Sequence, residues 1–120
     1  FLNCYNIFSG AVSGDAFESS VGRLALGGAQ QTSGKPAYAI RYDRVAIRPR
    51  DAAAAGDEVR IEASFVASEY SGAAINSFFT LDDGRVFEVE THLSHAAPEV
   101  FEEKARYALV WKREDALVFV

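Results

Sequence analysis

The chain has 120 residues, enough for one compact domain or two small, closely packed halves, and its 49% hydrophobic and 12% aromatic content can supply a buried core. The formal net charge of −5 argues against a general binder of polyanions. The single cysteine, Cys4, excludes an internal disulfide and favours a reducing compartment.

The N-terminal part of the chain predicts short strands separated by turns. Residues 5–12 are typical of a first strand, and residues 17–26 predict a second strand that ends at two glycines. The polar composition of residues 29–36 indicates an exposed loop. Residues 38–47 alternate as a third strand, but the apolar positions shift parity within it, so we expect a β-bulge near Asp43-Arg44.

The strongest pattern follows a short alanine-rich linker and runs from Val59 to Val89. Apolar residues recur with a period of two, as in half-buried strands, because successive side chains point to opposite faces. The pattern comprises three runs: Val59, Ile61, Ala63, Phe65 and Ala67; Ala73, Ile75, Ser77, Phe79 and Leu81; Phe87 and Val89. The turn sequences Tyr70-Ser71-Gly72 and Asp82-Asp83-Gly84-Arg85 separate the runs, and Asp-Gly favours a type I′ hairpin with positive φ at both central residues. The stretch therefore predicts a β-meander.

The C-terminal part predicts two further strands. Residues 92–98 lack periodicity and indicate a loop, residues 99–103 can form a helical turn, and residues 105–111 and 116–120 predict strands around a charged turn. With about eight strands and no long helix, the chain is expected to form an all-β, barrel-like fold. We expect residues 1–51 to supply N-terminal strands and residues 57–120 to form the main barrel.

Two groups of side chains raise the question of metal binding or catalysis. His92 and His95 lie three apart with Glu90 and Glu99 nearby, but zinc needs three or four converging ligands, so two solvated loop histidines are the favoured interpretation and no metal site is predicted. Neither acidic pair, Asp82-Asp83 nor Glu102-Glu103, presents two carboxylates to one substrate, since adjacent strand residues point opposite ways. The sequence contains no Gly-x-Ser-x-Gly nucleophile elbow, which would present a catalytic serine, and no Gly-x4-Gly-Lys-Ser/Thr loop, which would bind phosphate. We therefore predict no catalytic residue, no bound cofactor and no enzymatic activity for the chain alone.

A cluster of arginines supplies the candidate binding residues. Within ten residues the chain places four arginines against the single acid Asp43: Arg41, Arg44, Arg48 and Arg50. An anion site or a nucleic-acid site is one hypothesis. Pairing with the more acidic half of the chain, internally or across a dimer, is favoured, because residues 61–120 carry eleven acidic against five basic side chains and aromatics are not interleaved with the arginines.

Two features of the sequence concern the larger protein and the cellular compartment to which the chain belongs. It begins at Phe1 and has no methionine, so we expect a domain excised from a larger protein. It has no secretory leader and no apolar run near the ~18 residues that a membrane-spanning helix needs.

Five short motifs in fixed order resemble one family over nearly the whole chain, from Asn3 to Phe119. They are Asn6-Ile7-Phe8-x-Gly10-x-Val12, Ile47-Arg48-Pro49, Tyr70-Ser71-Gly72, Leu81-Asp82-Asp83-Gly84-Arg85 and Leu109-Val110-Trp111-x3-Asp115-Ala116-Leu117-Val118. The chain resembles the C-terminal TOBE-type regulatory domain of ABC-importer ATPases of the spermidine/putrescine and ferric-iron kind.

The resemblance implies an oligonucleotide-binding-like β-barrel that does not hydrolyse ATP and has Trp111 in its core. ATP and Mg²⁺ would bind the missing ATPase domain, which would also contact the membrane permease. The expected partner is a second copy of the ATP-binding subunit, at the cytoplasmic face of the bacterial membrane, without membrane insertion. The transported solute and the regulatory signal leave no trace in the sequence. A small-oxyanion sensor using the arginine-rich strand is an alternative, and a nucleic-acid-binding barrel is a second one that the acidic charge disfavours.

Overall fold

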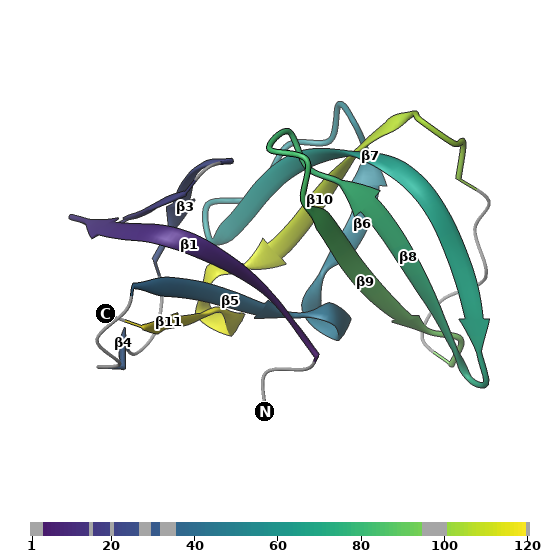
Figure 1. The fold of residues 1–120 in the computed structure, drawn as a ribbon, viewed down its shortest axis with the longest axis horizontal. Helices are drawn as coiled ribbons and strands as arrows, with labels where there is room; N and C mark the ends of the chain where they lie inside the picture. The colour runs from purple at the N-terminus through teal and green to yellow at the C-terminus, as the bar shows by residue number, and fades with distance from the viewer. Residues whose placement is uncertain are drawn as a thin grey trace.

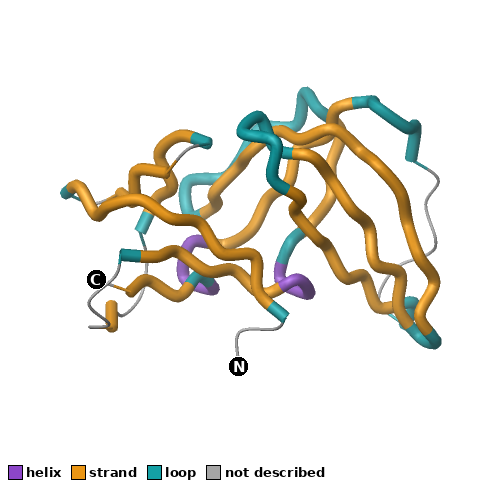
Figure 2. Tube along the Cα trace, in the orientation of Figure 1, coloured by secondary structure: helices purple, strands orange, loops and turns teal. Residues whose placement is uncertain are grey.

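The computed structural model describes residues 4–14, 16–19, 21–26, 30–31, 36–94 and 101–119. About two thirds of them lie in strands, and the only helices among them are two single-turn 3-10 helices (Figure 2). The first strands are β1 (Tyr5–Ser13), β2 (Ala16–Ser19), β3 (Gly22–Ala25), β4 (Gln30–Gln31), β5 (Ala37–Arg41) and β6 (Ala46–Pro49), with the helix η1 (Tyr42–Arg44) between β5 and β6. The others are β7 (Glu58–Ser71), β8 (Ala74–Thr80), β9 (Val86–His92), β10 (Arg106–Lys112) and β11 (Leu117–Phe119), with η2 (Arg113–Asp115) before β11. No helix in this described part is long and apolar enough to cross a lipid bilayer.

The strands form two sheets that meet around a shared core (Figure 1). One sheet has the order β3-β2-β1-β5-β11-β4, and the other has the order β6-β10-β7-β8-β9. All neighbours are antiparallel except β4 and β11. Strand β6, from the N-terminal half of the chain, belongs to the sheet of β7, β8 and β9, whereas the C-terminal strand β11 belongs to the sheet of β1 and β5. Each sheet therefore contains strands from both halves of the sequence.

The predicted meander is present as β7, β8 and β9. Its inward residues are buried as the alternation required, including Val59, Ile61, Phe79 and Val89. The pattern slips once: the β7–β8 register shifts between Phe65 and Ala67, so Phe65 is buried whereas Ala67 is exposed. A bulge of this kind bends a long strand, which allows β7 to curve around the core.

The Asp83-Gly84 hairpin is present, but the type I′ geometry is wrong. Gly84 has φ +87°, whereas Asp83 does not have a positive φ. The Gly84 amide donates to the Leu81 carbonyl, and the Leu81 amide donates to the Arg85 carbonyl. This pattern matches a three-residue loop in which glycine takes the left-handed position after a type I turn.

Three other expectations need correction, and together they raise the strand number from about eight to eleven among the described residues. The stretch 17–26 is two strands, β2 and β3, rather than one. The predicted bulge at Asp43-Arg44 is the helix η1, because the chain leaves one sheet there and enters the other. The predicted loop 29–36 contains the short strand β4, which pairs with β11. The all-β prediction itself is confirmed.

The core is aromatic where the two sheets meet. The Trp111 ring on β10 lies 6.5 Å from that of Phe8 on β1 and 5.8 Å from that of Phe87 on β9, measured between centroids. Its indole Nε1 donates to the buried hydroxyl of Tyr38 on β5 at 2.9 Å. Burial raises the pKa of Tyr38 to about 12, although the hydrogen bond from Trp111 opposes the shift. The predictions that Trp111 and Phe65 are core residues are confirmed.

Gly10 provides a test of how closely β1 and β2 pack. A Cβ atom at Gly10 would lie 1.8 Å from the backbone oxygen of Glu18. We expect Gly10→Ala to force the two strands apart and to lower the free energy of unfolding by about 1–3 kcal/mol, as overpacking does. The measurement is urea denaturation followed by far-UV circular dichroism. Gly56→Ala is the matched control, because its Cβ would meet nothing within 4 Å, and equal stabilities for the two variants would contradict the prediction.

Candidate functional site

The four predicted arginines lie on or next to consecutive elements: Arg41 ends β5, Arg44 lies in η1, Arg48 lies in β6 and Arg50 follows β6. Three of them bind carboxylates. Arg48 makes two hydrogen bonds of 3.1 Å to Glu58, Arg50 Nε lies 3.2 Å from Glu62, and Arg41 lies 2.9 Å from Asp43. Arg44 is exposed and forms no ion pair with a residue that the structure describes. The predicted anion or interface role of the four side chains stays a prediction.

These ion pairs shift the titration of the acids on β7. The hydrogen bond from Arg48 holds the pKa of Glu58 below its ordinary value, with a further contribution from the Ala55 amide. The hydrogen bond from Arg60 lowers the pKa of Glu62 in the same way. Both acids are only partly exposed, and the Arg48–Glu58 pair is bidentate, which is the geometry in which a surface ion pair contributes most to stability.

A second group of arginines, which the sequence did not reveal, lines a pocket of about 300 Å³ beside β3, β7 and β10. Arg23, Arg60 and Arg106 face it together with Glu62 and Asp82. Arg106 lies 3.0 Å from Asp82 and 3.5 Å from Glu62, and Arg60 lies 3.2 Å from Glu62. Among the lining residues three arginines stand against two acids, and Arg23 also lies 3.5 Å from Glu18, which is outside the lining. No local motif signals this pocket, because its arginines come from three separate strands.

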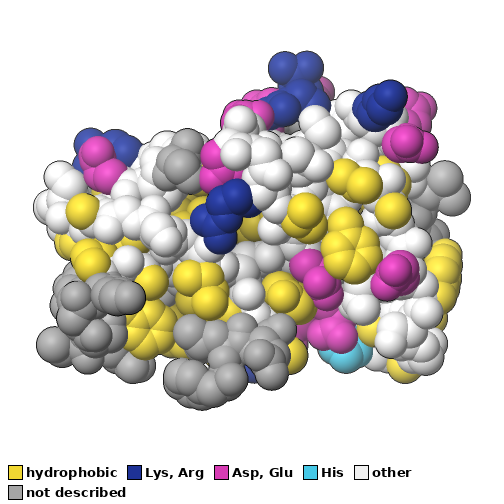
Figure 3. Space-filling model, viewed as in Figure 1, with side chains coloured by type: hydrophobic (Ala, Val, Ile, Leu, Met, Phe, Trp, Pro, Cys, Tyr) yellow, Lys and Arg dark blue, Asp and Glu magenta, His cyan; other side chains and the backbone are white. Residues whose placement is uncertain are grey.

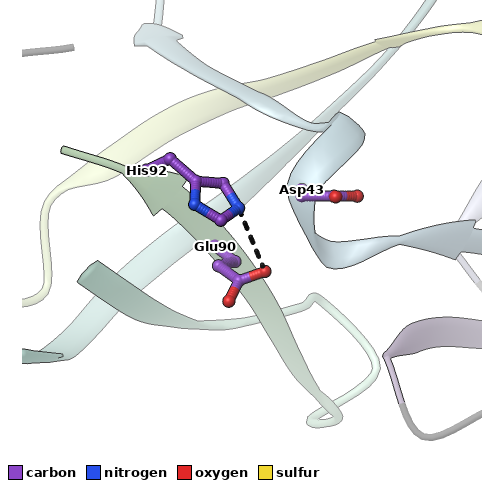
Figure 4. Close-up of side chains that lie close together, drawn as sticks. All are labelled: Asp43, Glu90 and His92. Carbon is purple, nitrogen blue, oxygen red and sulfur yellow. Dashed lines mark ion pairs between the residues drawn. The ribbon is translucent and has the colours of Figure 1, made fainter. Parts of the chain in front are cut away.

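A third group lies near the end of β9. Glu90, His92 and Asp43 place ligand-type atoms within 4.8 Å of one another, and His92 Nε2 lies 3.8 Å from Glu90 Oε2 (Figure 4). Figure 3 shows acidic side chains gathered around a histidine on one face of the molecule. Nearby, the pKa of Glu88 is raised by burial and then by the charges of Glu90 and Glu69.

Of the two predicted histidines, His92 lies among the described residues and His95 does not. Glu99 also lies outside the described residues. His92 was expected in a loop, but it is the last residue of β9. Asp43, which the sequence suggested only as a counter-charge for arginines, is the residue that η1 brings beside His92.

The two acidic pairs lie in different surroundings. Asp82 and Asp83 occupy the β8–β9 turn, where Asp82 pairs with Arg106 and Asp83 accepts the Arg85 amide at 3.0 Å. Glu102 and Glu103 are exposed before β10.

The model of the TOBE domain family matches residues 38–119, which is more than half of the chain. The chain belongs to the TOBE domain family. No curated protein matches its sequence. Among solved structures, this TOBE domain is similar to the cytoplasmic molybdate-binding protein ModG, in a crystal form with molybdate bound. The TM-score is 0.72, the identity is 12%, and the match covers 94% of each chain. The likeness shows that the TOBE domain has the predicted oligonucleotide-binding-like fold.

Proposed function

We propose that this TOBE domain is a non-catalytic binding domain for a small tetrahedral oxyanion such as molybdate or sulfate. The observation that carries the proposal is the pocket in which Arg23, Arg60 and Arg106 converge. Its setting supports the proposal, because the same fold in ModG holds molybdate.

The geometry suits an exchangeable anion. Guanidinium groups present paired N–H donors that match the oxygens of a tetrahedral anion. Arg106 pairs with Glu62 at 3.5 Å and with Asp82 at 3.0 Å; the Asp82 side chain is 68% exposed, so that pair is weak and an incoming dianion can replace it. Arg60 is held beside the pocket by hydrogen bonds from its Nε to the Ala52 carbonyl at 2.8 Å and from its Nη2 to the Arg50 carbonyl, and its Nη1 donates to Glu62 at 3.2 Å, so an anion would compete with Glu62 for this arginine.

Calorimetric titration and thermal shift with molybdate, sulfate and phosphate test the proposal. At an anion concentration of 100 times the dissociation constant, we expect a stabilisation of about 2.7 kcal/mol. Arg106→Gln should weaken binding at least tenfold, since a hydrogen bond to a charged group contributes about 1.5–3 kcal/mol.

The matched control is Arg113→Gln, which removes an exposed arginine outside the pocket and should leave the affinity unchanged. Absence of binding for all three anions, or equal affinity in the two variants, would contradict the proposal.

A second candidate is favoured by membership of the TOBE family together with the five ordered motifs. In this proposal the chain is an accessory regulatory and dimerisation domain of the ATP-binding subunit of an ABC importer for polyamine, iron or a similar solute. It would work in the cytoplasm at the inner face of the bacterial membrane, paired with a second copy and linked to the permease through an ATPase domain. Light scattering of the isolated chain tests its self-association, and tight binding of Mg-ATP by this chain alone would contradict the assignment.

A further inference from the structure

We propose that Asp43, Glu90 and His92 form a binding site for a divalent metal ion of the zinc class. The site shares no residue with the arginine-lined pocket and is independent of the proposed oxyanion function.

The backbone brings the three side chains together from two segments. Glu90 and His92 are alternate residues of β9, so they share one face of that strand. Asp43 comes from η1, which links the two sheets beside β9. All three side chains are partly buried. The two segments are 47 positions apart at Asp43 and Glu90, so the grouping exists only in the folded chain.

The donor set suits zinc. One imidazole nitrogen and two carboxylate oxygens are ligand types that zinc uses in sites with three protein ligands and an open fourth position. Bonds of about 2.0–2.2 Å place neighbouring tetrahedral ligand atoms roughly 3.3–3.6 Å apart. The 3.8 Å between His92 Nε2 and Glu90 Oε2 is close to that spacing, and all three ligand atoms lie within 4.8 Å of one another, so small side-chain rotations would bring them to it. An imidazole ligand favours zinc over Mg²⁺ or Ca²⁺, which prefer oxygen ligands.

Unsatisfied acceptors supply a second, independent observation. Among the described residues, the buried side-chain atoms without a hydrogen-bond partner are Asp43 Oδ1 and Asn76 Oδ1. The other carboxylate oxygen of Asp43, Oδ2, accepts a hydrogen bond from Arg41 Nη2. Asn76 lies directly opposite Glu90 in the β8–β9 ladder, so its side chain is on the same face of the sheet as that of Glu90. Buried acceptors without donors are rare in folded proteins, and a bound cation would satisfy them.

The surrounding charge favours a cation. Glu69 is opposite Asn76 on β7, and Glu88 shares the β9 face with Glu90. Arg41 provides one compensating charge through Asp43. A divalent ion would therefore reduce repulsion among these carboxylates as well as occupy the ligand set.

The test is calorimetric titration of the 120-residue chain with ZnCl₂, with MgCl₂ as the comparison, and the visible spectrum of the Co²⁺-loaded protein. We expect one zinc per chain, tetrahedral Co²⁺ absorption and no comparable Mg²⁺ binding. His92→Gln and Asp43→Asn should each weaken zinc binding at least tenfold, while circular dichroism without metal stays unchanged.

Two matched controls separate this site from adventitious binding. His95→Gln changes the other histidine, and Cys4→Ser removes the exposed thiol. Both should bind zinc as the native chain does. The proposal is overturned if zinc does not bind, if Asp43→Asn retains full affinity, or if either control loses as much affinity as His92→Gln.

Discussion

The Trp111→Ala variant is expected to lose about 3–5 kcal/mol of unfolding free energy, the usual cost of truncating a buried tryptophan. Trp111 is only 2% exposed and packs against Phe8 and Phe87, which come from different sheets. Its removal leaves a cavity where the sheets meet and also removes the donor to the buried Tyr38 hydroxyl. Because a domain of this size is stable by about 5–15 kcal/mol, the loss would be a large fraction of the total.

Urea denaturation followed by far-UV circular dichroism measures this loss, since the only tryptophan fluorophore is absent from the variant. Tyr38→Phe isolates the hydrogen bond: it keeps the ring, leaves the indole N–H unpaired and should cost about 1–3 kcal/mol. Tyr70→Ala is the surface control, because Tyr70 is 69% exposed and should change stability by no more than about 0.5 kcal/mol. A Trp111→Ala loss no greater than that of Tyr70→Ala would contradict the packing described here.

Asn6→Ala is expected to cost about 2–4 kcal/mol, because one side chain joins the two sheets. Asn6 Nδ2 donates to the Glu88 carbonyl at 2.7 Å, and the Glu88 amide donates to Asn6 Oδ1 at 2.9 Å. Glu88 lies on β9, the outer strand of its sheet, so these backbone groups have no further strand to pair with. Alanine leaves both without a partner, and each unsatisfied buried group costs about 1–3 kcal/mol.

The same denaturation experiment tests this prediction with two companion variants. Asn6→Asp keeps an acceptor for the Glu88 amide but places a carboxylate against the Glu88 carbonyl, so it should also be destabilised. Ser9→Ala, an exposed position on the same strand, is the matched control and should change stability by less than about 0.5 kcal/mol. If Asn6→Ala is as stable as Ser9→Ala, the side chain does not join the sheets in the manner described.

The meander could be predicted from sequence because its signals are local. The alternation from Val59 to Phe65 assigns residues to the two faces of β7 without knowledge of its neighbours. Gly84 marks the turn between β8 and β9 because a residue with positive φ is required there. The slip after Phe65 and the crossing at η1 were not predicted, since both depend on how strands fit against the opposite sheet.

The candidate sites also combine features that local sequence indicates with features that depend on the packing of distant segments. The sequence favoured pairing of the arginines near Arg48 with the acidic half of the chain, residues 61–120. Arg50 pairs with Glu62 from that half, whereas Arg48 pairs with Glu58, which lies outside it. Asp43 and Glu90 are distant in the chain, and nothing local indicates that η1 places one beside the other.

The sequence by itself determined an all-β domain, because period-two patterns and turn residues are properties of a few neighbouring amino acids, and five ordered motifs added the resemblance to the TOBE type. Only the tertiary structure decided which strands share a sheet, which arginines line a pocket, and which acids surround His92. Those choices depend on contacts such as Asn6 with Glu88 and Tyr38 with Trp111, which are 82 and 73 positions apart and form only when the two sheets pack.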